Sequence, residues 1–281
     1  AGVRFGQGTV NAHDEAAWLV LWRLGLPLDS ALDEAEGERA VGEGERQAVE
    51  QLIDTRIRTR RPAAYLTGEA WLQGVPFFVD ERVIIPRSFI AELIADGSID
   101  PWLGAHTQRV LDLCTGNGSL AVLAAMAWPE VSVTGSDLSP EALAVARRNV
   151  DRHGLADRID LRLSDGLRDV PGRFDLIVCN PPYVNAGSMD ALPPEFRAEP
   201  ALALAGGTDG MDFVRGLVRD AAAHLNEHGV LVLEIGHERA HFEQAFPRLE
   251  AVWLSTSAGD DQVLLLTREA LQSNPTEPVR P

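Results

Sequence analysis

Residues 110–119 read Val-Leu-Asp-Leu-Cys-Thr-Gly-Asn-Gly-Ser, and this stretch decides the fold class. Its apolar start, 110–114, predicts a buried strand, and residues 119–127 predict a helix. Gly116 and Gly118 let the backbone turn tightly between the two and leave room for a ligand beside the main chain. Gly116-x-Gly118-x-x-Ala121 also fits the Ala-ended dinucleotide-binding fingerprint, although an ordinary strand-to-helix turn would have the same pattern.

Further along the chain, strand-like runs alternate with helical patterns. Ser139 and Pro140 start one helix as N-cap and first-turn proline, and His153-Gly154 ends it. Another helix is predicted over 211–225. The predicted strands are 110–114, 131–136, 159–163, 174–179, 230–235, 252–255 and 263–267. This alternation predicts an α/β fold with a doubly wound, mostly parallel seven-stranded sheet, in which ligands bind at the carboxyl ends of the strands.

The chain before Pro86 is mainly helical in pattern. Helices are predicted over 14–24, with Asp14 as N-cap, and over 43–61, with a loop or weak helix at 33–44 between them. Two short strands, 70–72 and 77–79, flank a turn at Gln73-Gly74. The expected domains are a helical domain at 1–68, a β-hairpin linker at 69–86, the α/β domain at 87–272 and a disordered tail at 273–281.

Composition excludes several classes of protein. The 281 residues are 45% apolar and 24% charged, which excludes a largely disordered chain or a disulfide framework. The net charge of −17 repels nucleic-acid phosphates, although solubility alone also accounts for it. The apolar run at 16–24 is too short to span a bilayer. We therefore expect a soluble cytoplasmic protein with no membrane partner, whose Cys114 and Cys179 are reduced and close together at neighbouring strand ends.

Carboxylates follow the second and third predicted strands of the sheet. Asp137 lies 19 residues after Gly118, the spacing expected of a side chain that accepts both hydroxyls of a ribose. Asp165-Gly166 follows the third strand and can either accept from an adenine amino group or form a simple turn. Together these strand ends predict a cofactor that contains a nucleoside, and they leave NAD and S-adenosylmethionine both open.

The fourth strand ends in Asn180-Pro181-Pro182-Tyr183, the most specific motif in the chain. Two prolines fix two φ angles and remove two N–H donors, so that carbonyl groups are left without competing amide hydrogens. Asn180 adds a side-chain carbonyl, and Tyr183 adds a flat face for a planar group. This set of acceptors suits a planar NH2 group whose nitrogen is directed at an electrophile, a task that a dehydrogenase does not need.

Residues 112–119, Asp137 and residues 180–183 together resemble the class I S-adenosylmethionine-dependent methyltransferases that modify NH2 groups. Three further segments, Tyr65–Trp71, Phe77–Ser88 and Glu199–Gly210, resemble the HemK-type (N5-glutamine) protein methyltransferases. Within that family, Ser88-Phe89-Ile90-Ala91-Glu92 is most similar to the PrmB branch, which modifies a glutamine of the large-subunit ribosomal protein L-three. Phe89 departs from the proline expected at its position.

The resemblance implies methyl transfer from S-adenosyl-L-methionine to a glutamine side-chain amide, with S-adenosyl-L-homocysteine as product and no metal. It also implies that the helical N-terminal domain recognises the substrate protein. The predicted cofactor-binding residues are Asp112, Cys114, Thr115, Gly116, Asn117, Gly118, Asp137, Leu138, Asp165, Gly166 and Asn180. The predicted catalytic residues are Asn180, Pro181, Pro182 and Tyr183, and the predicted substrate-binding residues are Arg87, Asn180, Pro181 and Tyr183.

Four other functions remain as alternatives. Release factors are the substrates of the sister branch, and adenine-amino methyltransferases share the Asn-Pro-Pro-Tyr chemistry but need a basic groove, which the charge of this chain disfavours. A non-catalytic ribosome-binding module would not need the acceptor motif. His237–His241 matches the H-E-x-x-H zinc pattern, but no third ligand is evident, so we interpret the match as coincidence.

A run of four arginines between Arg56 and Arg61 offers an incidental contact with ribosomal RNA. A solvated helix face is the simpler interpretation of this run.

Overall fold

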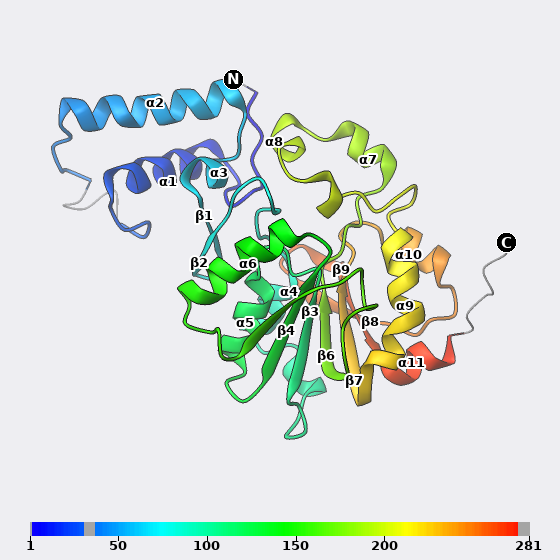
Figure 1. Cartoon of the computed structure of the whole chain (residues 1–281). Coiled ribbons are helices and arrows are strands. Elements are labelled where there is room, and N and C mark those ends of the chain that lie inside the picture. Colours follow the sequence, from blue (N-terminus) through cyan, green and yellow to red (C-terminus); the bar gives the residue numbers. More distant parts are fainter. Residues whose placement is uncertain (1, 31–36, 275–281) are drawn as a thin grey trace.

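The computed structural model describes residues 2–30 and 37–274. Within them, the strands of the main sheet are β3 (Arg109–Leu113), β4 (Ser132–Asp137), β5 (Ile159–Leu163), β6 (Phe174–Cys179), β7 (Leu225–Glu234), β8 (Val252–Thr256) and β9 (Gly259–Thr267). Their order in this part of the chain is β5-β4-β3-β6-β7-β9-β8, seven strands in one sheet (Figure 1). Strands β3 to β7 run parallel, whereas β9 is antiparallel to both β7 and β8.

Helices cover both faces of this sheet. One face packs against α4 (Ile90–Ala95), α5 (Ser119–Ala127) and α6 (Pro140–Arg152). The other packs against α9 (Asp212–His224), α10 (Arg239–Ala245) and α11 (Arg268–Ser273). Neighbouring residues of β3 serve opposite faces, since Val110 packs with the first set and Leu111 with the second. Burial on both faces explains the largely apolar run of the central strand β6, which is buried throughout, whereas the edge strand β5 alternates apolar and polar residues.

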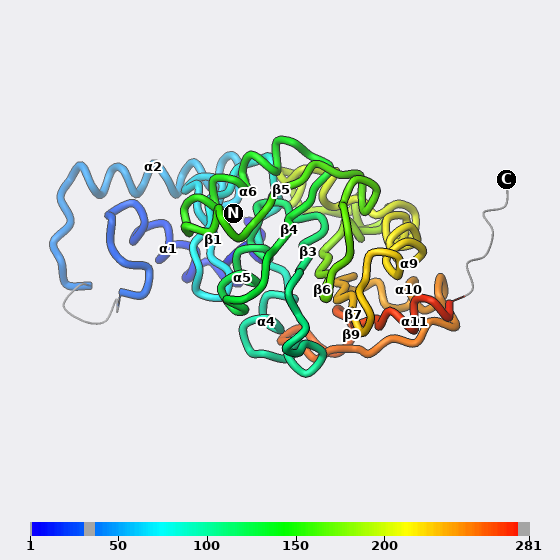
Figure 2. Tube along the Cα trace, turned by 60° about the horizontal axis from the view of Figure 1, so that its bottom comes forward, coloured from blue at the N-terminus to red at the C-terminus, as the bar shows by residue number. Residues whose placement is uncertain are grey.

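The N-terminal region packs to one side of the sheet. It consists of α1 (Ala12–Leu24), α2 (Glu43–Thr59), α3 (Ala63–Thr67) and a hairpin of β1 (Glu69–Leu72) and β2 (Val75–Phe78). The remaining short elements are η1 (Asp100–Trp102), α7 (Ala186–Ala191), α8 (Pro194–Arg197) and η2 (Ala201–Ala203). Both views place α1 and α2 at one end of the molecule and α11 at the other (Figures 1 and 2).

A buried carboxylate, Glu195 of α8, connects this region to the rest of the chain. Its Oε1 accepts hydrogen bonds from Arg60 Nε at 2.6 Å and from the backbone N–H of Arg4 at 2.9 Å, and Arg56 Nη1 lies 3.5 Å away. Arg56 also donates to Glu15 of α1 at 2.8 Å. The expectation that the arginine run is a solvated helix face is therefore wrong for Arg56, which is 3% exposed.

Most predicted elements are confirmed, several with identical bounds. Ser139 caps α6 as expected, its hydroxyl accepting from the N–H of Ala142. Asp14 as the cap of the first helix is wrong: the side chain of Asn11 accepts from two backbone N–H groups, and α1 starts at Ala12. Residues 33–36 of the predicted loop lie outside the described residues, and α2 begins at Glu43, within the end of that loop.

Some short helices were not predicted from the sequence. They are α3, α4, α7, α8, α10 and α11. The predicted disordered tail lies outside the described residues from 275 onward, and Ser273 ends α11 instead of starting a tail. In the described part of the chain, the helices are all too short or too polar to cross a lipid bilayer.

Candidate active site

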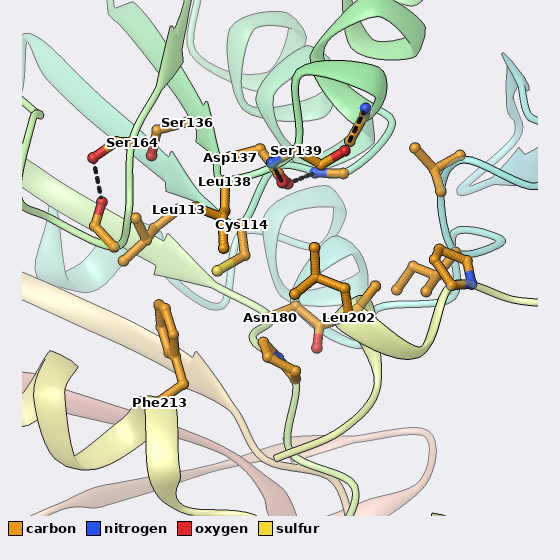
Figure 3. Close-up of a pocket in the computed structure, with 18 of the residues that line it drawn as sticks. Leu113, Cys114, Ser136, Asp137, Leu138, Ser139, Ser164, Asn180, Leu202 and Phe213 are labelled. Atoms are coloured by element: carbon orange, nitrogen blue, oxygen red, sulfur yellow. Dashed lines mark hydrogen bonds between the residues drawn. The ribbon is translucent and has the colours of Figure 1, made fainter. Parts of the chain in front are cut away.

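A cavity opens at the carboxyl ends of β3, β4, β5 and β6 (Figure 3). Cys114, Asp137 and Asn180 reach it from three different strand ends. Its remaining walls come from the linker at Arg82–Ile84, from the segment around η2 and from the start of α9. The cavity therefore lies where the doubly wound topology places ligands.

The loop after β3 is held mainly by its own residues. Asp112 is fully buried, and its Oδ2 accepts from Thr115 Oγ1 at 2.5 Å and from the N–H of Ala121 at 2.9 Å. Its Oδ1 is buried without a hydrogen-bond partner, and burial raises the pKa of this carboxyl to about 7. Gly116, at φ 55°, lines the cavity, and a Cβ there would meet no atom within 4 Å. The loop thus presents open space at Gly116 and an unsatisfied acceptor at Asp112.

Asp137 stands beside this loop at the end of β4. Its Oδ2 accepts from the N–H of Gly116 and its Oδ1 from the N–H of Ser139, each at 2.9 Å. Burial raises the pKa of this carboxyl above its ordinary value, while the backbone donors favour the ionised form. Each oxygen keeps a lone pair for a further donor. Because Asp137 also lines the cavity, it can accept two hydroxyl groups there.

Asn149 of α6 ties the linker hairpin to the glycine loop. Its Nδ2 donates to the carbonyls of Phe78, at 2.9 Å, and of Asn117, at 2.8 Å, and its Oδ1 accepts from the N–H of Phe78 at 2.7 Å. The side chain is fully buried, so its capacity for hydrogen bonds is used inside the protein. Nothing in the local sequence pattern marks this asparagine, which looks like an ordinary helical residue.

The elbow, residues 180–183, forms the opposite side of the site. Asn180 and Pro182 line the cavity, whereas Pro181 is buried. Tyr183 does not line the cavity, and its hydroxyl lies 3.4 Å from Glu234 Oε1. The elbow therefore presents an amide side chain to the cavity and directs its tyrosine elsewhere.

Arg87 forms a bidentate ion pair with Glu199, with N–O distances of 2.6 and 2.8 Å. Glu199 also accepts from the N–H of Ile85 at 3.0 Å. This pair joins the linker to the segment that walls the cavity. Its guanidinium lies beside the site and is already engaged by a carboxylate.

The structure brings about half of the predicted site residues onto one cavity. Those that line it are Cys114, Gly116, Asp137, Leu138, Asp165, Gly166, Asn180 and Pro182. Those that do not line it are Arg87, Asp112, Thr115, Asn117, Gly118, Pro181 and Tyr183. Gly118 serves close packing, because a Cβ there would lie 3.1 Å from the Cβ of Ala146 in α6.

Several lining residues were missed by the sequence analysis, among them Arg82, Leu202 and Phe213. Leu202 lies in the 199–210 segment, and the resemblance of that segment to the family could have indicated its place at the site. Arg82 falls in the linker segment of the same resemblance, and no local pattern marks Phe213.

The zinc-like motif of the sequence has a different arrangement. Glu238 accepts from Asn185 Nδ2 at 2.6 Å and contacts His241 Nδ1 at 2.5 Å. Among the described residues, there is no group of three or more His, Cys, Asp and Glu side chains placed to hold a metal ion.

The two cysteines are both free, with Cys179 buried and Cys114 half-buried.

Known proteins resemble this chain over nearly its whole length. The family model described as "Methyltransferase small domain" matches residues 99–196. The ribosomal protein uL3 glutamine methyltransferase of Bordetella pertussis is 55% identical over 276 residues, covering 97% of this chain and 92% of the relative. The protein of the same name from Neisseria meningitidis serogroup B is 49% identical over 280 residues, covering 96% and 89%.

Solved structures support the fold alone. A methyltransferase from Pyrococcus furiosus has a TM-score of 0.51 at 18% identity, over 80% of this chain and 98% of that chain. The hMettl16 catalytic domain, solved with an RNA hairpin, has a TM-score of 0.54 at 14% identity, over 80% and 81%. Because relatives from two genera are 49% and 55% identical to it over nearly its whole length, the chain belongs to the ribosomal protein uL3 glutamine methyltransferases.

Proposed function

We propose that this protein transfers a methyl group from S-adenosylmethionine to the side-chain amide nitrogen of a glutamine in ribosomal protein uL3. The observation that carries the proposal is the meeting of Asp137 and Asn180 on one cavity. One is an acceptor for ribose hydroxyls, and the other is an acceptor for an amide. The names of the relatives supply the substrate.

The residues of the cavity fit the cofactor. The open space at Gly116 admits a ligand against the main chain, and Asp137 has lone pairs for two hydroxyls. Behind the lining, the buried Asp112 holds this loop through Thr115 and Ala121. Asp165 and Gly166 line the end of the cavity that we assign to adenine. When bound, S-adenosylmethionine supplies a methyl group made electrophilic by its sulfonium.

The elbow acts by positioning. An amide nitrogen is a weak nucleophile because its lone pair is delocalised, so alignment has to lower the barrier, and holding reactants in line can contribute roughly 7–11 kcal/mol. We assign Asn180 Oδ1 and the carbonyl of Pro181 to accept the two N–H bonds of the glutamine. The same acceptors stabilise the positive charge that develops on the nitrogen. The proton then leaves late, to solvent.

The N-terminal region completes the proposal. We assign substrate recognition to the helical region 1–68, with the hairpin at 69–86 as the linker to a catalytic region at 87–272. Ribosomal proteins are made in the cytoplasm, so we place the enzyme there.

The test of the proposed function is methyl transfer from labelled S-adenosylmethionine to recombinant uL3 by the full chain. Asn180→Ala is expected to abolish transfer while it leaves cofactor affinity within about threefold, since the ribose acceptor is intact. Asn274→Ala, at the end of α11, is the matched control and is expected to retain activity.

Normal turnover by Asn180→Ala would overturn the mechanism. Faster labelling of a release factor than of uL3, or labelling of adenine in nucleic acid, would overturn the assignment of uL3 as the substrate.

A further inference from the structure

Glu234 is a buried carboxyl beside the elbow to which the proposed reaction assigns no role. It is the last residue of β7 and is 2% exposed. Its Oε2 accepts from Ser88 Oγ at 2.5 Å, from the N–H of Phe89 at 2.9 Å and from the N–H of Ile90 at 3.4 Å. Its Oε1 receives the hydroxyl of Tyr183 at 3.4 Å. One carboxyl thus joins the Ser88–Ile90 turn, which follows the linker, to the elbow.

Tyr183 is confined on its other sides by backbone. A Cβ at Gly236 would lie 2.5 Å from Cε2 of the tyrosine ring, so the ring packs directly against that glycine. A Cβ at Gly210 would overlap the carbonyl oxygen of Tyr183. One edge of the ring therefore packs against Gly236, and the hydroxyl at its end contacts Glu234. The motif predicts Tyr183 as a flat face for the substrate, whereas this residue does not line the cavity.

We propose that Glu234 is a positioning residue for the reaction and acts through Tyr183. Glu234 binds the tyrosine hydroxyl through one oxygen and the Ser88–Ile90 turn through the other. It thereby fixes the position of the elbow relative to the segment that follows the linker. This inference rests on the proposed function, because the elbow must be the amide site for its position to set the rate. Displacement of a reacting group by about 1 Å can cost roughly a hundredfold in rate.

The charges around Glu234 support a role based on hydrogen bonds. The nearest guanidinium, Arg87, is bidentate with Glu199 and makes no ion pair with Glu234. Burial raises the pKa of the Glu234 carboxyl to about 7, against the opposing effect of its Ser88 and backbone donors. Four donors from two places, the Ser88–Ile90 turn and Tyr183, converge on the two oxygens. A neutral glutamine amide has nearly the same shape and keeps one acceptor oxygen. Glutamine is therefore the conservative replacement.

The experiment compares Glu234→Ala, Glu234→Gln and Tyr183→Phe in the full chain with uL3 as substrate. Glu234→Ala is expected to lower kcat by about thirtyfold, with the KM for uL3 and the cofactor Kd changed by less than about threefold, because misplacement acts on the reacting geometry. Glu234→Gln is expected to recover kcat to within about fivefold of the wild type, since its amide keeps most contacts. Tyr183→Phe keeps the ring and is expected to lower kcat by about tenfold.

The double variant Tyr183→Phe/Glu234→Ala decides whether the two residues act as one unit. A kcat no lower than that of Glu234→Ala alone supports the inference, whereas multiplied losses overturn it. If Glu234→Ala does not fold, Tyr183→Phe carries the test: a kcat about tenfold lower supports the inference, and an unchanged kcat overturns it.

The failure of this inference is distinguishable from that of the proposed function. Normal kcat in Glu234→Ala, with Asn180→Ala inactive, rejects the inference alone. A wild-type protein that does not methylate uL3 rejects the proposed function itself.

Discussion

The two sides of the cavity are held in different ways. On the cofactor side, Asp112 bonds Thr115 three residues away. On the elbow side, Tyr183 contacts Glu234, 51 residues away, and Glu234 contacts Ser88, 146 residues away. The glycine loop on the cofactor side is therefore held mainly by contacts around β3, β4 and the start of α5, with further support from Asn149 of α6. The elbow side takes its geometry from the assembled fold, so changes far from the motif should alter catalysis without altering cofactor binding.

The largest expected effect comes from replacing a glycine by alanine, a change that can be made on each side of the cavity for comparison. In Gly210→Ala, at φ 79°, the new Cβ would overlap the carbonyl oxygen of Tyr183, so the elbow must shift. We expect kcat to fall by roughly a hundredfold and the free energy of unfolding by about 2–4 kcal/mol. In Gly116→Ala the Cβ meets no atom, so the backbone strain costs only about 1–2 kcal/mol and the main loss is in cofactor affinity.

Urea unfolding measures the free energy of unfolding, calorimetry with S-adenosylmethionine measures cofactor affinity, and turnover of uL3 measures kcat. If Gly210→Ala and Gly116→Ala lost kcat to the same extent and cofactor affinity to the same extent, the two sides of the cavity would not differ as described.

A pH dependence of stability is expected from one buried carboxyl on each side. Burial raises the pKa of Asp112 and of Glu234 to about 7, whereas both groups ionise near pH 4 in the unfolded chain. Between about pH 4 and pH 7 the folded protein therefore holds protons that the unfolded chain has released. The free energy of unfolding should fall as the pH rises through this window, by up to about 1.4 kcal/mol per pH unit for each group.

Urea unfolding between pH 5 and pH 8 would measure this slope in variants of each side. Asp112→Asn and Glu234→Gln should each flatten part of it, and Glu227→Gln, at an exposed carboxyl, is the control. Slopes in the two variants equal to that of the wild type would show that these carboxyls are ionised throughout.

A smaller effect is expected from Asp137→Ala. The substitution removes the two hydroxyl acceptors and the bonds to the N–H groups of Gly116 and Ser139. A charge-assisted hydrogen bond contributes about 1.5–3 kcal/mol, so we expect the cofactor Kd to rise by roughly thirtyfold. Calorimetry would measure it, with Tyr183→Phe as a comparison whose cofactor Kd should stay unchanged. A raised cofactor Kd in both Asp137→Ala and Tyr183→Phe would mean that the two sides of the cavity are coupled.

The same difference explains what the sequence could predict. The strand, glycine loop and helix at 110–127 follow from apolar runs and two glycines, and Asp137 and Asn180 lie directly after predicted strands. The role of Glu234 could not be predicted, because its partners come together only when β7, the linker and the elbow are assembled.

Local patterns also misled in two places. The pattern predicts Asp14 as the helix cap, but the cap is Asn11, three residues earlier, whose side chain accepts from the N–H groups of His13 and Asp14. Arg56 belongs to a run of basic residues typical of a solvated surface. It is buried because Glu15 and Glu195, both distant in sequence, pack against it.

Glu195 has a consequence for any attempt to divide this protein. Its carboxylate has no exposed surface, and the guanidinium groups of Arg56 and Arg60 that neutralise it come from the helical region. Removal of one partner from a buried ion pair typically costs 3–5 kcal/mol. A fragment that starts after residue 68 would keep the anion and lose its counter-charges, next to the segment that walls the cavity. Residue 68 therefore marks a change of architecture along the polypeptide, while the working enzyme is indivisible at that point.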